Sequence, residues 1–113
     1  MEADFARREF LKFAAASPYV AALGGADAWL ARHLSGYAAW AKTSNSLLVV
    51  TWDEDDNSGN DQIPTMFYGA GVKTGTYGEA ISHFNVLSTI EQMYGLPKTG
   101  FAGQAPAVSD IWT

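Results

Sequence analysis

The sequence predicts one α/β domain in which helices flank parallel-type strands. Three observations predict this class. Apolar residues recur at helical spacing over residues 27–42, an uninterrupted apolar run of strand length covers residues 47–52, and a second helical pattern covers residues 82–95. A length of 113 residues, of which 48% are hydrophobic, supplies a single hydrophobic core and excludes a multidomain protein.

The first predicted helix spans Asp27 to Lys42. Its apolar side chains recur every three or four residues, and Asp27 is placed to cap its N-terminus. We expect one helix that Gly36 weakens slightly, because glycine is a poor helix former. The polar pair Asn45 and Ser46 ends the pattern. The apolar positions are Trp29, Leu30, His33 or Leu34, Tyr37, Trp40 and Ala41.

Two strands separated by a polar loop are predicted next. Residues 47–52, LLVVTW, form a run of β-branched and aromatic side chains that is typical of a central parallel strand buried on both faces. Residues 63–68 predict a second strand, in which Pro64 is tolerated because it lies near the start. Residues 53–62, DEDDNSGNDQ, are polar and acidic and therefore leave the first strand as a loop.

The last third of the sequence predicts turns, one helix and an irregular tail. Glycine-rich turns cover residues 69–78. The helix begins near Ser82 and ends at Gly95, with Pro97 shortly beyond the stop. We expect the tail up to Thr113 to be irregular.

Residues 1–26 have the layout of an export signal. A twin arginine at residues 7–8 precedes a moderately apolar stretch over residues 13–23, and residues 26–28, Ala-Asp-Ala, offer an A-x-A cleavage site. This order resembles a twin-arginine signal and implies a periplasmic or secreted protein. The apolar stretch is too short to span a bilayer. The alternative is an amphipathic first helix that Pro18 bends or ends.

The charge balance argues against nucleic acid as a partner. Seven Lys and Arg against twelve Asp and Glu give a formal net charge of −5, which repels phosphate backbones and anionic lipid headgroups. The chain has no Cys and two His. A bound metal is therefore expected to have oxygen or imidazole ligands and no thiolates.

The candidate chemistry is concentrated directly after the first strand, where four carboxylates follow one another. Ligands of open α/β sheets bind outside the carboxyl ends of the strands, so these side chains lie where a site belongs. Packed like charges cost free energy unless a cation offsets them, and adjacent carboxylates suit a divalent ion. A solvated acidic loop explains the same pattern, and the EF-hand spacing is absent. The four residues are Asp53, Glu54, Asp55 and Asp56.

His83 is the second candidate and lies at the start of the last predicted helix. A neutral imidazole there can ligate a metal or donate to a phosphoryl oxygen, whereas the alternative is a capping or surface residue. His33 lies among Trp and Leu side chains and is interpreted as structural. Thr51, Ser58 and Ser82 have nucleophilic side chains, and none lies in an activating motif such as G-x-S-x-G. The sequence therefore nominates no nucleophile.

Several separated blocks of the sequence match, in order, a known pattern. They are NSLLVVTWDEDD at 45–56, IPT at 63–65, GTY at 75–77, HFNVLSTIE at 83–91, YGL at 94–96 and SDIW at 109–112. Together they resemble the C-terminal part of the bacterial phosphoesterase family, which includes acid phosphatases and non-haemolytic phospholipases C and belongs to the alkaline phosphatase superfamily. The resemblance covers residues 27–112 and implies part of a three-layer sandwich.

The resemblance implies a metal-dependent hydrolase of phosphate esters with a Ser or Thr nucleophile. A divalent ion acts as a Lewis acid on the phosphoryl oxygens in such an enzyme. By motif, Asp53 and Glu54 fall on the family's acidic pair and are the implied metal ligands. His83 falls on the family's His before the last helix and is the implied catalytic residue. Gln62 stands where relatives often have His.

Family members are several times longer, and their N-terminal half, which carries the nucleophile, has no counterpart here. We therefore expect a truncated homologue, with a signal segment over residues 1–26 and a phosphoesterase portion over residues 27–113. One hypothesis is phosphate ester hydrolysis of the phosphatase or phospholipase C type. The other is a non-catalytic acidic remnant that binds a metal or a partner. An incomplete sheet has an exposed edge, so the expected partner is a complementary segment or a second copy.

Overall fold

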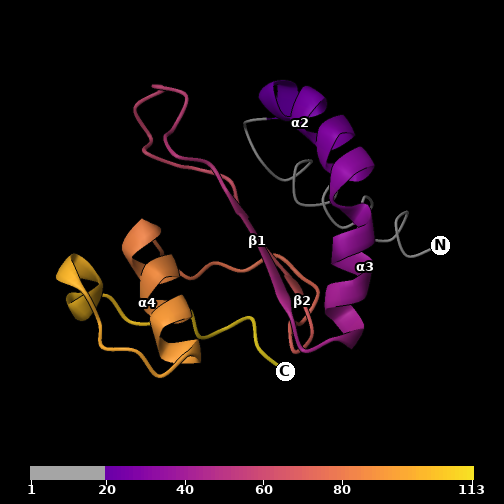
Figure 1. The fold of residues 1–113 in the computed structure, drawn as a ribbon. Coiled ribbons are helices and arrows are strands. Elements are labelled where there is room, and N and C mark those ends of the chain that lie inside the picture. The colour runs from indigo at the N-terminus through magenta and orange to yellow at the C-terminus, as the bar shows by residue number, and fades with distance from the viewer. Residues whose placement is uncertain (1–19) are drawn as a thin grey trace. The chain divides into compact units, whose positions relative to one another are not determined.

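The computed structural model describes residues 20–113, in which the chain divides into two compact units that are described separately. The first unit extends to Val72 and the second runs from Lys73 to Thr113. Both helices and strands are present, as the predicted class requires. The first unit contains α2 (Val20–His33), α3 (Ser35–Thr43), β1 (Leu47–Thr51) and β2 (Thr65–Gly69), and the second contains α4 (His83–Met93) and the 3-10 helix η1 (Gly100–Gln104) (Figure 1).

The helix predicted over residues 27–42 begins earlier and is interrupted. α2 starts at Val20, so Asp27 lies inside the helix and does not cap it. The Ala-rich residues before Asp27 favour the helix strongly enough to continue it through two glycines. Leu34 separates α2 from α3, although its N–H donates to the carbonyl of Leu30 and its carbonyl accepts the N–H of Ala38. The export signal predicted over residues 1–26 lies outside the described residues up to residue 19.

β1 and β2 form an antiparallel hairpin, so the prediction of a central parallel strand was wrong. Leu47 pairs with Gly69 and Thr51 pairs with Thr65. The connecting residues 52–64 contain no helix, whereas parallel neighbours need a crossover connection that is usually helical. Both strands are largely half-buried rather than buried on both faces. The continuous apolar run identified a strand but carried no information about its direction.

Helix α3 packs on this hairpin and contacts both strands (Figure 1). Ala38 and Ala41 are the buried residues of α3, and their small side chains allow a close approach. The carbonyl of Ala41 accepts the N–H groups of Ser46 and Ala70, which lie at the two strand ends next to the helix. The core of the first unit therefore lies between α3 and the sheet.

Gly69 is required at the end of β2 because the backbone of Ser46 is too close for a side chain. A Cβ on Gly69 would collide with the carbonyl oxygen of Ser46. We expect Gly69→Ala to destabilise the chain by about 1–3 kcal/mol, since the backbone must move. Gly36→Ala is the matched control, because nothing lies within 4 Å of its Cβ position. It is expected to be neutral or stabilising by up to about 1 kcal/mol in denaturant unfolding. Equal losses for both variants would contradict this packing.

The second unit is built on α4, and its start agrees with the prediction. The side chain of Ser82 accepts the N–H of Phe84 at 3.2 Å, and the side chain of Asn85 accepts the N–H of Ser82 at 2.8 Å, which is a capping box. Beyond the end of α4, Gly95 has a φ of 63°, a left-handed conformation that favours glycine.

The tail, predicted to be irregular, contains η1 and folds back onto α4. The hydroxyl of Ser88 donates to the carbonyl of Ala105 at 2.7 Å, and the N–H of Val108 donates to the hydroxyl of Thr89 at 2.8 Å. The buried apolar residues of this unit are Val86, Ala102, Val108 and Ile111. Within residues 20–113, no helix has the length and hydropathy of a membrane span.

Candidate functional site

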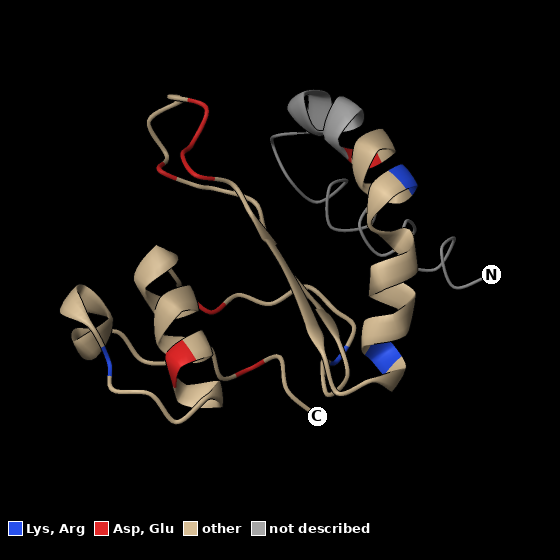
Figure 2. Ribbon diagram, viewed as in Figure 1, with Lys and Arg blue, Asp and Glu red and all other residues tan. Residues whose placement is uncertain are grey.

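The acidic residues lie on the loop that joins β1 to β2, as the sequence predicts. Figure 2 shows them gathered at the far end of the hairpin. Asp53 and Glu54 follow β1 almost directly, and both side chains are exposed. The hairpin therefore presents two adjacent carboxylates to solvent at the end of a strand.

Hydrogen bonds within the loop fix the carboxylates of the acidic run. The side chain of Asp53 accepts the N–H of Glu54 at 3.0 Å, and that of Asp56 accepts the N–H of Ser58 at 3.0 Å. The side-chain and backbone hydrogen bonds from Ser58 lower the pKa of Asp56. Asn57 has a φ of 60°, a conformation that Asn tolerates in tight turns. These bonds are those of a well-formed polar turn.

The donor chemistry of Asp53 and Glu54 suits a hard divalent cation, because both are carboxylates with oxygen available. Such a cation needs six or more oxygen ligands, and water molecules can supply some of them. Among the residues that the structure describes, no group of three or more His, Asp and Glu side chains is arranged to hold a metal ion. Asp53 and Glu54 are therefore two adjacent carboxylates outside any such group.

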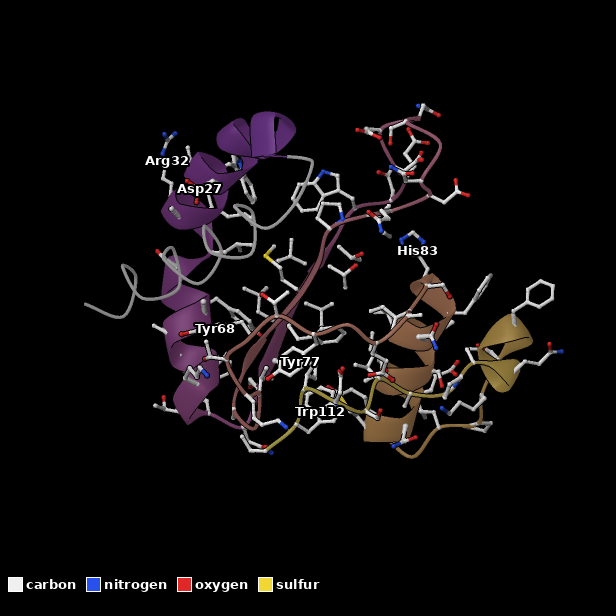
Figure 3. All side chains as sticks on the ribbon, turned by 180° about the vertical axis from the view of Figure 1, so that it is seen from behind. Asp27, Arg32, Tyr68, Tyr77, His83 and Trp112 are labelled. Carbon is white, nitrogen blue, oxygen red and sulfur yellow. The ribbon has the colours of Figure 1, made fainter. Side chains whose placement is uncertain are left out.

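His83 is the first residue of α4 and is exposed (Figure 3). Ser82 supplies the cap of this helix, so the capping role considered for His83 belongs to its neighbour. The N-terminus of a helix is the positive end of its dipole and favours anions. His83 therefore lies in a setting compatible with contact to a phosphoryl group.

The candidate residues belong to different units. Asp53 and Glu54 lie in the first unit, and His83 lies in the second. The surroundings of the acidic pair and those of His83 are therefore described separately, each within its own unit. His33, interpreted as structural, lies on the exposed side of α2 with its ring centroid 4.6 Å from that of Trp29.

The candidate nucleophiles have structural partners. Ser82 is the cap of α4, and the hydroxyl of Thr51 lies 2.9 Å from that of Thr65 across the hairpin. A Ser and Lys pair that the sequence did not suggest is formed by Ser88 and Lys98, whose amino group donates to the Ser88 hydroxyl. Ser88 is fully buried and out of reach of a substrate, so this pair holds α4 to the following loop.

Comparisons with known proteins place these residues in a family. The sequence model of the Phosphoesterase family matches residues 20–97, a range that includes Asp53, Glu54 and His83. A phosphatidylinositol-3-phosphatase of Mycobacterium tuberculosis (strain ATCC 25618 / H37Rv) is 73% identical over 86 residues, which are 76% of this chain and 29% of that protein. The chain thus spans less than a third of this relative. No solved structure is significantly similar to the present chain.

Proposed function

Because the chain belongs to the phosphoesterase family, we propose that it acts in the metal-dependent hydrolysis of phosphate esters. The observation that carries this proposal is the family match over residues 20–97 together with 73% identity to a protein named as a phosphatase. The activity is of the phosphatase or phospholipase C type. Since the chain spans 29% of that relative, the proposed role is that of one portion of such an enzyme.

Asp53 and Glu54 are the proposed ligands of a divalent ion. They are adjacent, exposed and oxygen-bearing, and they lie at the end of β1. A bound ion supplies Lewis acidity toward phosphoryl oxygens. The loop hydrogen bond to Asp53 holds its carboxylate in place, so less conformational entropy is lost when a cation binds.

His83 is proposed to contact the phosphoryl group. Its position at the start of α4 combines an imidazole with the positive end of the helix dipole, and both favour an anion. The relative is named as a phosphatidylinositol-3-phosphatase, so a phosphorylated inositol lipid is the substrate class to test first.

The remaining expectations concern how the chain is completed and where it acts. We propose that the β1–β2 hairpin is part of an alkaline-phosphatase-like three-layer sandwich. Within the described residues the sheet has two strands, and the family resemblance implies a larger sheet. A complementary segment or a second copy is proposed to complete it. Residues 1–26 are proposed to direct export to the periplasm or beyond.

The alternative is a non-catalytic acidic portion of the fold that binds a metal or a partner. It is favoured by the loop, whose Asp side chains accept backbone N–H groups as in an ordinary polar turn. It predicts metal binding or association without turnover, whereas the proposed function predicts turnover that depends on Asp53.

Metal binding through the acidic pair is tested by calorimetric titration of the chain with Mn²⁺, Mg²⁺ and Ca²⁺. We expect Asp53→Asn and Glu54→Gln each to weaken binding by about 10–100-fold, because each removes a charged oxygen ligand. Asp61→Asn is the matched control, since it removes the same charge from the same exposed loop. A wild-type chain that binds none of the three ions would contradict the proposal, as would equal losses in all three variants.

A further inference from the structure

Glu79 fastens the C-terminal segment to the chain that leads into α4. One oxygen of its carboxylate accepts the N–H of Ser109 at 2.9 Å and the N–H of Asp110 at 3.2 Å. The other oxygen accepts the hydroxyl of Ser109 at 3.1 Å. Three donors on one carboxylate stabilise its ionised form. The sequence distance between the partners is about thirty residues, so these bonds close a long loop.

The carboxyl group of Asp110 also interacts with Glu79. Burial, a side-chain hydrogen bond with Glu79 and the charge of Glu79 raise the pKa of Asp110. Such a bond requires one proton, because two ionised carboxylates have acceptors only. The Oδ1 atom of Asp110 is buried and has no hydrogen-bond partner among the described residues. An ionised Asp110 is therefore poorly solvated and faces a like charge.

We propose that Glu79 and Asp110 form a carboxyl pair that shares one proton and acts as a pH-operated clasp on the C-terminal segment, residues 108–112. The clasp is closed while Asp110 carries the proton and donates it to Glu79. It loosens when that proton leaves, because two negative charges then meet. The proposal is independent of the proposed hydrolytic function.

The electrostatics of the pair agree with this assignment of the proton. Burial raises the pKa of Asp110, and the hydrogen bond and charge of Glu79 raise it further. The N–H of Ser109 is the main cause that lowers the pKa of Glu79. Glu79 accepts three donors, whereas Oδ1 of Asp110 is buried and has none, so Glu79 is assigned as the ionised partner and Asp110 as the protonated one.

The signs of the two shifts define the pH window. A raised folded-state pKa means that the contribution of Asp110 is present in acid and is lost as the pH rises through that pKa. A lowered folded-state pKa means that the contribution of Glu79 is lost as the pH falls through its pKa. The clasp is therefore tightest below the raised pKa of Asp110 and above the lowered pKa of Glu79.

Among the described residues of the second unit, no other charged group is a cause of the pKa shifts of Glu79 and Asp110. The N–H of Lys73 donates to the carbonyl of Ile111 at 2.8 Å, and the hydroxyl of Tyr77 donates to the carbonyl of Lys73 at 2.9 Å. These bonds use backbone atoms and do not involve either carboxyl group. Among the described residues, the charge that acts on Asp110 is that of Glu79. The further titratable side chains of this unit are His83, Glu91, Tyr94 and Lys98.

Carboxyl ¹³C titration by NMR on the full chain, with amide hydrogen exchange, tests the clasp. We expect Asp110 to titrate above its ordinary value and Glu79 below. Exchange at Ser109 and Asp110, divided by the intrinsic rate, should accelerate as Asp110 ionises. Asp110→Asn keeps a hydrogen-bond donor toward Glu79 at every pH, so its amide protection should no longer depend on pH across that range. Asp61→Asn, an exposed acid in the first unit, should retain the wild-type behaviour.

Two results would overturn the clasp. One is titration of both carboxyl groups at their ordinary values. The other is amide protection at Ser109 and Asp110 that stays constant while Asp110 ionises. If Asp110→Asn does not fold, Glu79→Gln provides the same test, because the Gln oxygen still accepts an N–H while the charge is absent. The pKa of Asp110 should then fall toward its ordinary value, and an unchanged pKa would count against the pair.

Discussion

Replacing His83 by Gln is expected to lower the turnover of a phosphate ester by about 100-fold or more, which is the lower end of the contribution of a positioned acid or base. Gln retains a donor but cannot carry the positive charge of imidazolium or transfer a proton. The loss should appear in kcat rather than in KM, since the contact is made with charge that develops during the reaction. Steady-state kinetics with a chromogenic phosphate ester measure both constants.

The matched control for this prediction is His33→Gln. His33 is also exposed and helical, and it packs beside the ring of Trp29. Turnover of His33→Gln should equal that of the unaltered chain. Ser82 and Asn85 supply the cap of α4, so His83→Gln should keep its helix content in circular dichroism. A folded His83→Gln variant with unaltered kcat would contradict the assignment of His83 to the site.

Truncating Glu91 is the second change with a large expected effect, here on stability. Its side chain is buried, 5% exposed, and accepts the N–H and the hydroxyl of Thr99. These bonds hold the loop after α4 against the helix. Glu91→Ala leaves both donors without this acceptor in a partly buried setting. We expect a loss of about 1–3 kcal/mol in the free energy of unfolding, measured with denaturant.

Two variants separate the lost hydrogen bonds from a general effect on the helix. Gln92→Ala changes an exposed neighbour on α4 and should alter stability by less than about 0.5 kcal/mol. Glu91→Gln keeps one acceptor oxygen for Thr99 and should fall between Gln92→Ala and Glu91→Ala. If Glu91→Ala were as stable as Gln92→Ala, the bonds to Thr99 would not stabilise this unit.

Helix α4 was predicted closely because its signals are local. Ser82 and Asn85 lie three residues apart, the spacing of a capping box, and Gly95 takes the left-handed conformation just beyond the end. The loop of acidic residues after β1 was predicted for the same reason, since a run of charged residues ends an apolar strand. Local backbone chemistry decides such features without help from the rest of the chain.

Features that depend on distant partners could not be predicted in this way. The direction of β1 relative to β2 is set by the pairing of the two strands, and the apolar run alone does not specify that pairing. The start of α2 depends on the balance between the Ala-rich residues and two glycines before Asp27. The hydrogen bonds of Glu79 are of the same kind, because their donors lie about thirty positions later in the chain.

The candidate site divides in the same manner. The sequence placed Asp53 and Glu54 on a loop at the end of a strand and His83 at the start of a helix, and the structure has them there. Their roles came from the family resemblance, and the family match supports that resemblance. Joint action on one substrate is a property of the whole site, and a measurement of turnover tests it.

The most direct test of the account is hydrolysis of a chromogenic phosphate monoester and diester by the purified chain, with and without divalent ions, beside Asp53→Asn. We predict turnover that requires a divalent ion and that falls by about 100-fold or more in the variant. A folded chain that binds the ion but shows no turnover would contradict it and favour the non-catalytic alternative. Turnover that is equal in the two proteins would contradict the assignment of Asp53 to the site.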